Sequence, residues 1–193
     1  GQAGENVSVE RLAEIYLNLQ EQGANNINLV TAGHYAPAVA ESLRRAKDMG
    51  LQIPVVFNSS GYELPDTLRL LDGLVDIYLP DMKYMDGELA GKYSHAQNYP
   101  DVAKAALEEM VRQCPVCEFD ERGRMKKGVI VRHLLLPGHV KESKAVLKYL
   151  HETYQDQIYI SIMSQYTPMP QMITYPELNR RVTKREYSRL LDY

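Results

Sequence analysis

The sequence predicts an α/β fold in which helices alternate with strands of a parallel sheet. Short apolar runs rich in β-branched residues recur along the chain, and polar or turn-forming residues follow each run. Segments with apolar residues at helical spacing lie between the runs. Buried strands separated by helices are typical of parallel sheets, and short right-handed connections favour a sheet or barrel. The functional site of such a fold lies at the carboxyl ends of its strands.

Composition narrows the class of protein further. The chain has 193 residues, of which 45% are hydrophobic and 24% are charged, and its net charge is −3. These values are ordinary for a globular protein, and they predict one domain over residues 1–193. A nucleic-acid site would need a basic patch, and a membrane span would need a longer apolar stretch. We therefore expect a cytoplasmic protein with no nucleic-acid or membrane partner.

The first expected helix covers residues 8–22. Its apolar residues recur on one face, Ser8 can cap its first turn, and Gly23 can adopt the left-handed conformation that ends a helix. A strand at 28–30 follows. The order of helix, glycine and strand then occurs twice more, at 37–49, Gly50 and 55–57, and at 65–72, Gly73 and 74–79.

The second half of the chain continues the alternation. Two helices are expected within 86–113, then a surface loop or hairpin at 114–128, a strand at 129–136, a helix at 141–153, a strand at 159–163 and a long loop at 166–182. Thr183 and Glu186 have the spacing of a capping box, which predicts a last helix after Thr183.

Asp81 and Lys83 are the first candidate site residues. They lie two positions apart just past a strand, so an extended backbone would direct both side chains to the same side. Such a pair can bind a polar ligand, and the aspartate could tune the lysine for Schiff-base chemistry. The alternative is a surface ion pair at the start of a loop.

Arg132 and His133 lie inside an apolar run, where a charge is costly unless it is paired. Alternation along a strand sends the two side chains to opposite faces. We expect Arg132 to point inward to an anion and His133 to be a hydrogen-bonded packing residue.

Other strand ends offer weaker candidates. Glycine allows a ligand to approach the backbone closely, and short polar side chains suit a ribose or a carboxylate. Turn formation and helix capping explain the same residues equally well. The residues concerned are Gly33, His34, Asn58, Ser60, Gln165 and Tyr166.

Cys114 and Cys117 are the only cysteines in the chain. A Cys-x-x-Cys pair can be half of a metal site or a redox pair, but zinc needs four ligands and no second pair is present. The pair also lies away from the expected strand ends, so it is a weak signal for a functional site.

With these residues in view, the chain resembles the radical S-adenosylmethionine superfamily, and within it the pyruvate formate-lyase activating enzymes and their uncharacterised homologues. Five stretches carry the resemblance in the right order: Asn-Ile-Asn-Leu-Val-Thr at 26–31, Asn-Ser-Ser-Gly-Tyr-Glu at 58–63, Asp-Ile-Tyr-Leu-Pro-Asp-Met-Lys at 76–83, Val-Arg-His-Leu-Leu-Leu-Pro-Gly at 131–138 and Ser-Gln-Tyr-Thr-Pro at 164–168.

The resemblance implies a partial, open (β/α)6 barrel similar to a TIM barrel. It also implies an oxidoreductase in which a [4Fe-4S] cluster reductively cleaves S-adenosylmethionine to a 5′-deoxyadenosyl radical. Activating enzymes use that radical on a glycyl radical enzyme or another protein substrate. Flavodoxin or ferredoxin would be the implied electron donor.

The chain departs from the family at two points. The Cys-x3-Cys-x2-Cys cluster motif is absent, so this chain has no cluster ligands and we expect it to be inactive as it stands. We interpret Gly1 as a truncation point, with the first strand and the cluster loop upstream, so that the chain is the larger, C-terminal part of a radical S-adenosylmethionine core domain. The family's Gly-Gly-Glu is Ala32-Gly33-His34 here, which removes a carboxylate that would receive the cosubstrate's amino group.

The resemblance also implies roles for individual positions. Residues 31–34, with Thr31 at their start, would meet the methionine amino end, and Asn58 and Ser60 would lie near the carboxylate or ribose. Asp81 and Lys83 would lie near the cosubstrate and the radical target. Arg132 matches an inward arginine, and Gln165 and Tyr166 match the strand end near adenine.

Two rival functions remain open. A barrel lyase or aldolase would use Lys83 as a Schiff-base amine with Asp81 beside it. A non-catalytic binding scaffold would use the same fold without chemistry.

Overall fold

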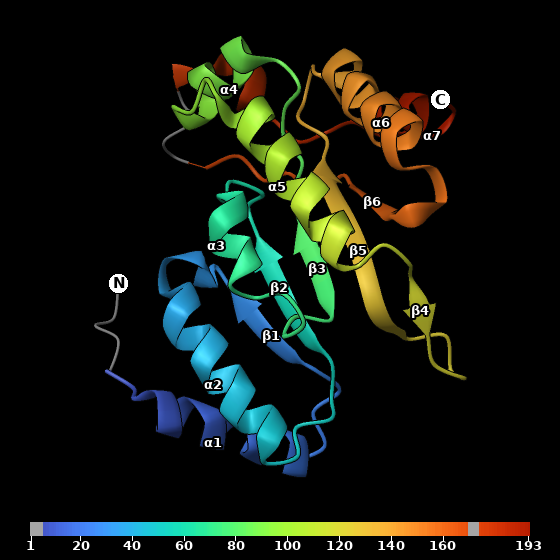
Figure 1. Cartoon of the computed structure of the whole chain (residues 1–193). Coiled ribbons are helices and arrows are strands. Elements are labelled where there is room, and N and C mark those ends of the chain that lie inside the picture. The colour runs from blue at the N-terminus through green and yellow to red at the C-terminus, as the bar shows by residue number, and fades with distance from the viewer. Residues whose placement is uncertain (1–5, 170–173) are drawn as a thin grey trace.

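A computed structural model describes residues 6–169 and 174–193 (Figure 1). Gly1 lies outside the described residues, and so do residues 170–173 of the loop expected at 166–182. The described residues form seven α-helices and six strands.

The sheet follows the order of the chain. Its parallel strands are β1 (Ile27–Val30), β2 (Val55–Ser59), β3 (Ile77–Pro80), β5 (Met125–Leu134) and β6 (Tyr159–Met163). Neighbouring strands in this series pair in parallel, which gives four parallel pairings. A doubly wound sheet reverses its strand order at one point, whereas this sheet winds in one direction as a barrel does. β1 and β6 are its two ends, so the fold is an open, partial α/β barrel, as the sequence predicts.

The helices occur where the sequence predicts them. They are α1 (Val9–Glu21), α2 (Ala36–Asp48), α3 (Pro65–Arg69), α4 (Gly87–Ser94), α5 (Tyr99–Gln113), α6 (Val140–Tyr154) and α7 (Lys184–Leu191). α3 is shorter than the predicted helix at 65–72, because the backbone beyond Arg69 tightens into turns in which Leu71 N–H donates to the Leu68 carbonyl at 2.9 Å. None of the described helices has the length and hydropathy that a membrane crossing requires.

The predicted helix ends are confirmed. The Ser8 hydroxyl accepts from Arg11 N–H at 3.1 Å and caps α1, and Gly23 follows that helix with φ +84°. Thr183 and Glu186 form the predicted capping box at the start of α7. Local sequence therefore determines where these helices begin and end.

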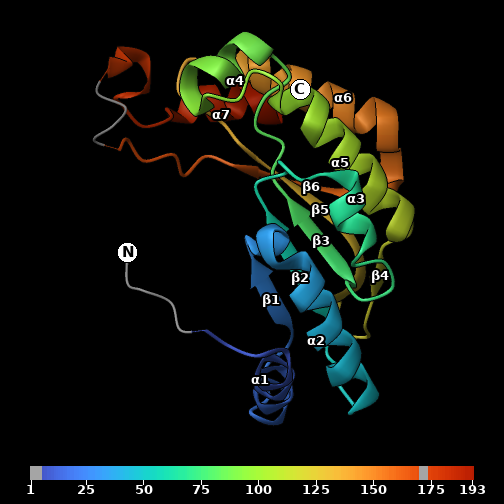
Figure 2. The ribbon, with the colours of Figure 1, turned by 60° about the vertical axis from the view of Figure 1, so that its left-hand side comes forward.

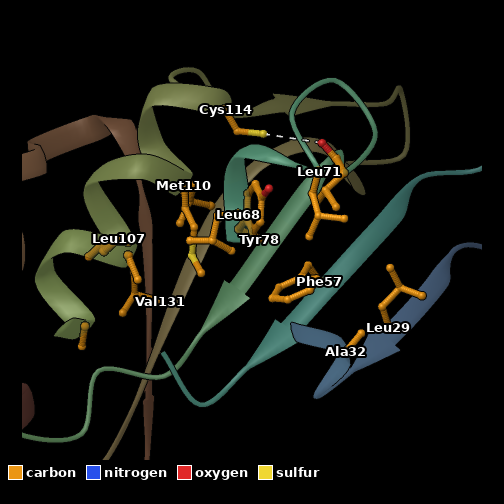
Figure 3. Packing of buried hydrophobic residues seen from close by; sticks show 14 of the residues in the cluster. Leu29, Ala32, Phe57, Leu68, Leu71, Tyr78, Leu107, Met110, Cys114 and Val131 are labelled. Atoms are coloured by element: carbon orange, nitrogen blue, oxygen red, sulfur yellow. Dashed lines mark hydrogen bonds between the residues drawn. The ribbon is translucent and has the colours of Figure 1, made fainter. Parts of the chain in front are cut away.

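One face of the sheet packs against helices (Figures 1 and 2). Phe57 and Tyr78 point from β2 and β3 toward Leu68 and Met110 of α3 and α5, and all four are essentially excluded from solvent (Figure 3). Because successive side chains of a strand alternate, the residues next to them face the other way. That side, here called the open face, carries Asn58 and Arg132 near the carboxyl ends of β2 and β5.

The predicted loop or hairpin at 114–128 is a hairpin. β4 (Glu118–Phe119) pairs antiparallel with the first residues of β5, so β5 begins at Met125 rather than at 129. The turn is stabilised by Asp120, whose carboxylate accepts from Arg122 N–H and Arg124 N–H, each at 2.9 Å. This hairpin lies at the amino end of β5, away from the carboxyl edge of the sheet.

Candidate functional site

An ion pair joins the ends of β3 and β5 on the open face. Arg132 Nε donates to Oδ1 of Asp81 at 2.8 Å, and Arg132 Nη2 lies 2.7 Å from the same oxygen in an ion pair. Arg132 Nη2 also donates to Oδ1 of Asn58 on β2 at 2.8 Å. Three neighbouring strands thus contribute one side chain each to a connected polar network. The anion expected opposite Arg132 is a carboxylate of this chain itself.

The backbone of β3 and β5 continues to pair beyond the strand ends and thereby fixes this network. Asp81 forms an isolated parallel bridge with Arg132, and Met82 N–H donates to the Arg132 carbonyl at 2.9 Å. Asp81 N–H donates to the Ser59 carbonyl at 3.0 Å on the other side. Asp81 therefore has a defined position between two strands although it follows β3.

A cavity of about 490 Å³ lies beside the ion pair. Asp81 and Lys83 both line it. The other lining residues are Tyr84, Tyr93, Ser94, Arg132, Leu134, Leu136, Met163, Gln165, Tyr166, Met169 and Leu178. The volume is in the range of small-molecule sites, and the wall is mostly apolar with a few polar groups at one side, as such sites usually are.

Lys83 is the cation of this cavity that has no carboxylate partner. Within residues 6–169 and 174–193, its ammonium forms no salt bridge, whereas Arg132 is paired with Asp81. Half-buried ammonium groups are normally paired or hydrated. The cavity therefore presents one free positive charge beside an apolar wall, and this arrangement suits a ligand with an anionic group.

His133 is the packing residue that alternation predicts. It is 1% exposed, its Nδ1–H donates to the Met82 carbonyl at 2.7 Å, and its Nε2 accepts from the Ser143 hydroxyl at 2.8 Å. Burial lowers the pKa of this imidazole. His133 thus ties the β3 end to α6 from the helix side, opposite Arg132.

Gln165 and Tyr166 follow β6 and line the cavity, as expected for a strand end. Tyr166 is buried, and its hydroxyl has no hydrogen-bond partner among the residues that the structure describes. Gln165 is exposed, and its amide approaches Met163 Sδ at 3.6 Å.

The remaining sequence candidates do not reach the cavity. Thr31 has φ +55° and precedes a 3-10 helix (Ala32–Tyr35) that contains Gly33 and the exposed His34. Gly33 packs against the Glu63 carboxylate, so closely that a Cβ there would lie 2.2 Å from Glu63 Oε2. Ser60 is exposed; its carbonyl accepts from the Tyr99 hydroxyl at 2.8 Å, and its hydroxyl accepts from Tyr62 N–H at 3.4 Å. Thr31, Gly33 and His34 therefore lie at the β1 end of the edge, separate from the network.

Sequence reasoning missed the residues that close the cavity from α4 and the C-terminal segment. Tyr93 donates to Glu177 Oε1 at 2.6 Å and approaches His139 Nε2 at 3.0 Å. Lys92 pairs with the same Glu177 oxygen at 2.6 Å and lowers the pKa of Glu177 to about 2. These contacts hold the segment that carries Leu178 over the cavity. The high tyrosine content, 14 residues, was the available signal, but it did not indicate which tyrosines were involved.

The cysteines lie elsewhere. Cys114 is buried, and its thiol contacts the carbonyls of Val75 at 3.9 Å and Asp76 at 3.5 Å, just before β3 begins (Figure 3). Burial raises the pKa of this thiol to about 11. Cys117 contacts the Gln157 carbonyl at 3.4 Å. Both are therefore at the amino end of the sheet, opposite the cavity.

Comparisons with known proteins agree with the fold. A domain of a pyruvate-formate lyase-activating enzyme from Bacteroides vulgatus superposes with a TM-score of 0.58 at 11% identity, over 86% of this chain and 89% of that one. This likeness shows the fold alone. The active domain 2 of a Pyrococcus furiosus chitinase gives a TM-score of 0.49 at 13% identity, over 100% and 70% of the two chains, which is too low to carry an argument.

Sequence comparisons do not establish a family. An uncharacterized protein of Methanocaldococcus jannaschii is 29% identical over 170 residues, which cover 88% of this chain. The chain spans 46% of the length of that relative. No protein-family model matches the chain.

Proposed function

We propose that this chain binds S-adenosylmethionine at the carboxyl edge of its sheet and is the cosubstrate-binding part of a radical enzyme of the activating-enzyme type. The observation that carries the proposal is the way Arg132 binds Asp81. Both of its nitrogens converge on Oδ1, and no residue in the described ranges donates to Oδ2. Asp81 lines the cavity, and its second carboxylate oxygen can accept from the hydroxyls of a ribose.

The rest of the cavity supports the same ligand. The aromatic and thioether side chains of Tyr84, Tyr166 and Met163 provide apolar surface for a flat base, and Lys83 provides a cation for a carboxylate. Arg132 and Asn58 orient Asp81. Bound S-adenosylmethionine would supply the alkyl-sulfonium chemistry of the reaction, whereas these residues bind and orient it.

The iron-sulfur cluster does not fit the described residues. Within them, no three His, Cys, Asp or Glu side chains are grouped so that they could hold a metal ion. Cys114 and Cys117 lie at the opposite end of the sheet. We therefore assign no redox step to these residues, and the proposal for them concerns binding.

The activity of the whole protein is part of the proposal. It rests on the five ordered sequence motifs together with the fold shared with an activating-enzyme domain. A glycyl radical enzyme or another protein would be the substrate, and a flavodoxin or ferredoxin would supply the electron. The chain spans 46% of the length of its relative, so these partners are proposed for a protein of that length.

Equilibrium dialysis with labelled S-adenosylmethionine tests the binding. We expect saturable binding to one site, competition by S-adenosylhomocysteine, and no competition by methionine at the same concentration. An Asp81→Asn variant should bind at least about tenfold more weakly, because a charge-assisted hydrogen bond to the ligand becomes a neutral one. Absence of saturable binding to the folded wild-type chain at millimolar ligand would refute the proposal.

A lyase or aldolase is the second candidate, and it is favoured by Lys83, which lines the mostly apolar cavity and forms no ion pair with the residues that the structure describes. It predicts that borohydride traps an aldehyde or ketone on Lys83, detectable as a mass increase that the Lys83→Met variant lacks. A carbonyl panel that leaves Lys83 unmodified would exclude it.

A further inference from the structure

Tyr99, the first residue of α5, places one hydroxyl between two loops of the candidate site. This hydroxyl lies 2.8 Å from the Ser60 carbonyl and 3.0 Å from the Asp81 carbonyl. It also accepts from Lys83 N–H at 3.1 Å. The side chain is 3% exposed, so water does not substitute for these contacts. One atom thus connects the end of β2 with the segment that carries both Asp81 and Lys83.

The chemistry of the hydroxyl restricts how these groups are arranged. A phenol has one proton to donate and can accept at its oxygen. It therefore shares its proton between the two carbonyls while it accepts from Lys83 N–H. The three hydrogen bonds are part-buried, so loss of this partner would leave polar groups that water satisfies only incompletely, which is costly.

The surrounding residues fit this arrangement closely. Tyr62 stacks on the Tyr99 ring with centroids 6.0 Å apart, and Tyr84 packs edge-on at 5.7 Å. Gly61 has φ +82°, and a Cβ there would lie 2.1 Å from the Asp81 carbonyl oxygen and 3.1 Å from the Tyr99 hydroxyl. Only a glycine lets the two loops approach closely enough for one hydroxyl to reach both.

We infer that Tyr99 is a positioning residue of the site: its hydroxyl fixes the 81–83 segment against β2, so that Asp81 meets Arg132 and Lys83 faces the cavity. Its effect on the ligand rests on the proposed function, whereas its effect on the segment does not. Tyr99 lines no part of the cavity and would act through Asp81 and Lys83.

The test compares Tyr99→Phe with Tyr78→Phe. Tyr78 is also buried, and it donates its hydroxyl proton to Gln113 Oε1 at 2.5 Å on the helix side of the sheet, so it controls for the loss of a buried phenol. Amide hydrogen exchange is measured at Asp81 and Met82, whose N–H groups donate to the Ser59 and Arg132 carbonyls and not to Tyr99. Dialysis with S-adenosylmethionine is the second measurement.

We expect Tyr99→Phe to accelerate exchange at both amides about tenfold or more and to weaken ligand binding about tenfold, which corresponds to one net hydrogen bond. Tyr78→Phe should change neither. The inference would be overturned if Tyr99→Phe folds and the amides of Asp81 and Met82 still exchange at the wild-type rate. If the wild-type chain binds no S-adenosylmethionine but exchange accelerates, the positioning role stands and the proposed function fails.

A second variant keeps the inference testable if the Tyr99→Phe chain does not fold. Para-aminophenylalanine at position 99 retains donors for both carbonyls but is a poorer acceptor for Lys83 N–H. We expect wild-type exchange at Asp81 and Met82 and faster exchange at Lys83. Fast exchange at all three amides would show that a donor at this point does not hold the segment.

Discussion

Arg132 uses two nitrogens on one oxygen of Asp81, at 2.8 Å from Nε and 2.7 Å from Nη2. A fork-like pair would occupy both carboxylate oxygens. Here no residue of the described ranges donates to Oδ2, and Asp81 lines a cavity. This geometry distinguishes a candidate ligand site from an ion pair that only stabilises the fold.

Loss of this ion pair should affect both stability and binding. Arg132→Gln leaves the Asp81 carboxylate without its cation, so we expect a loss of about 1–3 kcal/mol in the free energy of unfolding. Binding of S-adenosylmethionine should weaken in the same variant. Urea denaturation and dialysis measure the two effects. Arg124→Gln is the control, since Arg124 is exposed and pairs with Asp120 far from the cavity. A larger loss of stability and binding in Arg124→Gln than in Arg132→Gln would contradict this view.

Lys83 should matter for a ligand and not for the fold. Because its ammonium forms no ion pair in the described part of the chain, Lys83→Met should change the free energy of unfolding by no more than about 0.5 kcal/mol. S-adenosylmethionine should bind more weakly to that variant because the cation facing its carboxylate is gone. Lys126→Met, at an exposed position in β5, is the matched control for both measurements. Unchanged ligand affinity in Lys83→Met would remove Lys83 from the site.

Alanine substitutions at two glycines with similar backbone conformations distinguish the cost of backbone strain from the cost of steric crowding. Gly61 and Gly73 have φ +82° and +76°, but a Cβ at Gly73 would meet no atom within 4 Å. Gly73→Ala should therefore cost only the left-handed conformation, about 1 kcal/mol. Gly61→Ala should cost clearly more, since the Asp81 carbonyl must move. Equal thermal midpoints for the two variants would mean that the close approach of the loops is not required.

His133 should make stability depend on pH. Burial lowers its pKa below 6.5, so the unfolded chain binds a proton more readily than the folded one. The contribution of His133 to the free energy of unfolding is complete above pH 6.5 and decreases as the pH falls below that value. His133→Gln should flatten the slope of unfolding free energy against pH in this window, although His139, whose pKa is also lowered, keeps part of it. A wild-type slope in His133→Gln would contradict the assignment.

Short-range periodicity accounts for what the sequence could predict. The alternation of side chains along one strand was enough to place Arg132 on the open face and His133 under α6. The same rule placed Asp81 and Lys83 on one side. Glycines and capping residues likewise marked where helices end, because those conformations depend on a few neighbouring residues.

Contacts between segments that lie far apart along the chain account for the features of the site that the sequence could not predict. Tyr99 bonds to Ser60 and Asp81, which lie 39 and 18 residues away, and no local pattern encodes that distance. The cavity wall from α4 and the C-terminal segment depends on Tyr93 and Glu177, 84 residues apart. Thr31, Gly33 and His34 end a strand as expected, but the packing of Gly33 against Glu63 leaves them apart from the cavity.

The most direct test of the proposed site maps binding residue by residue. Amide NMR spectra of the labelled chain are recorded while S-adenosylmethionine is added. The proposed site predicts saturable shifts at Asp81, Lys83, Arg132 and Tyr166, at the carboxyl edge of the sheet. Shifts confined to the cavity at the opposite edge, around Asn25, Gln52 and Arg124, or no shifts at millimolar ligand, would contradict it.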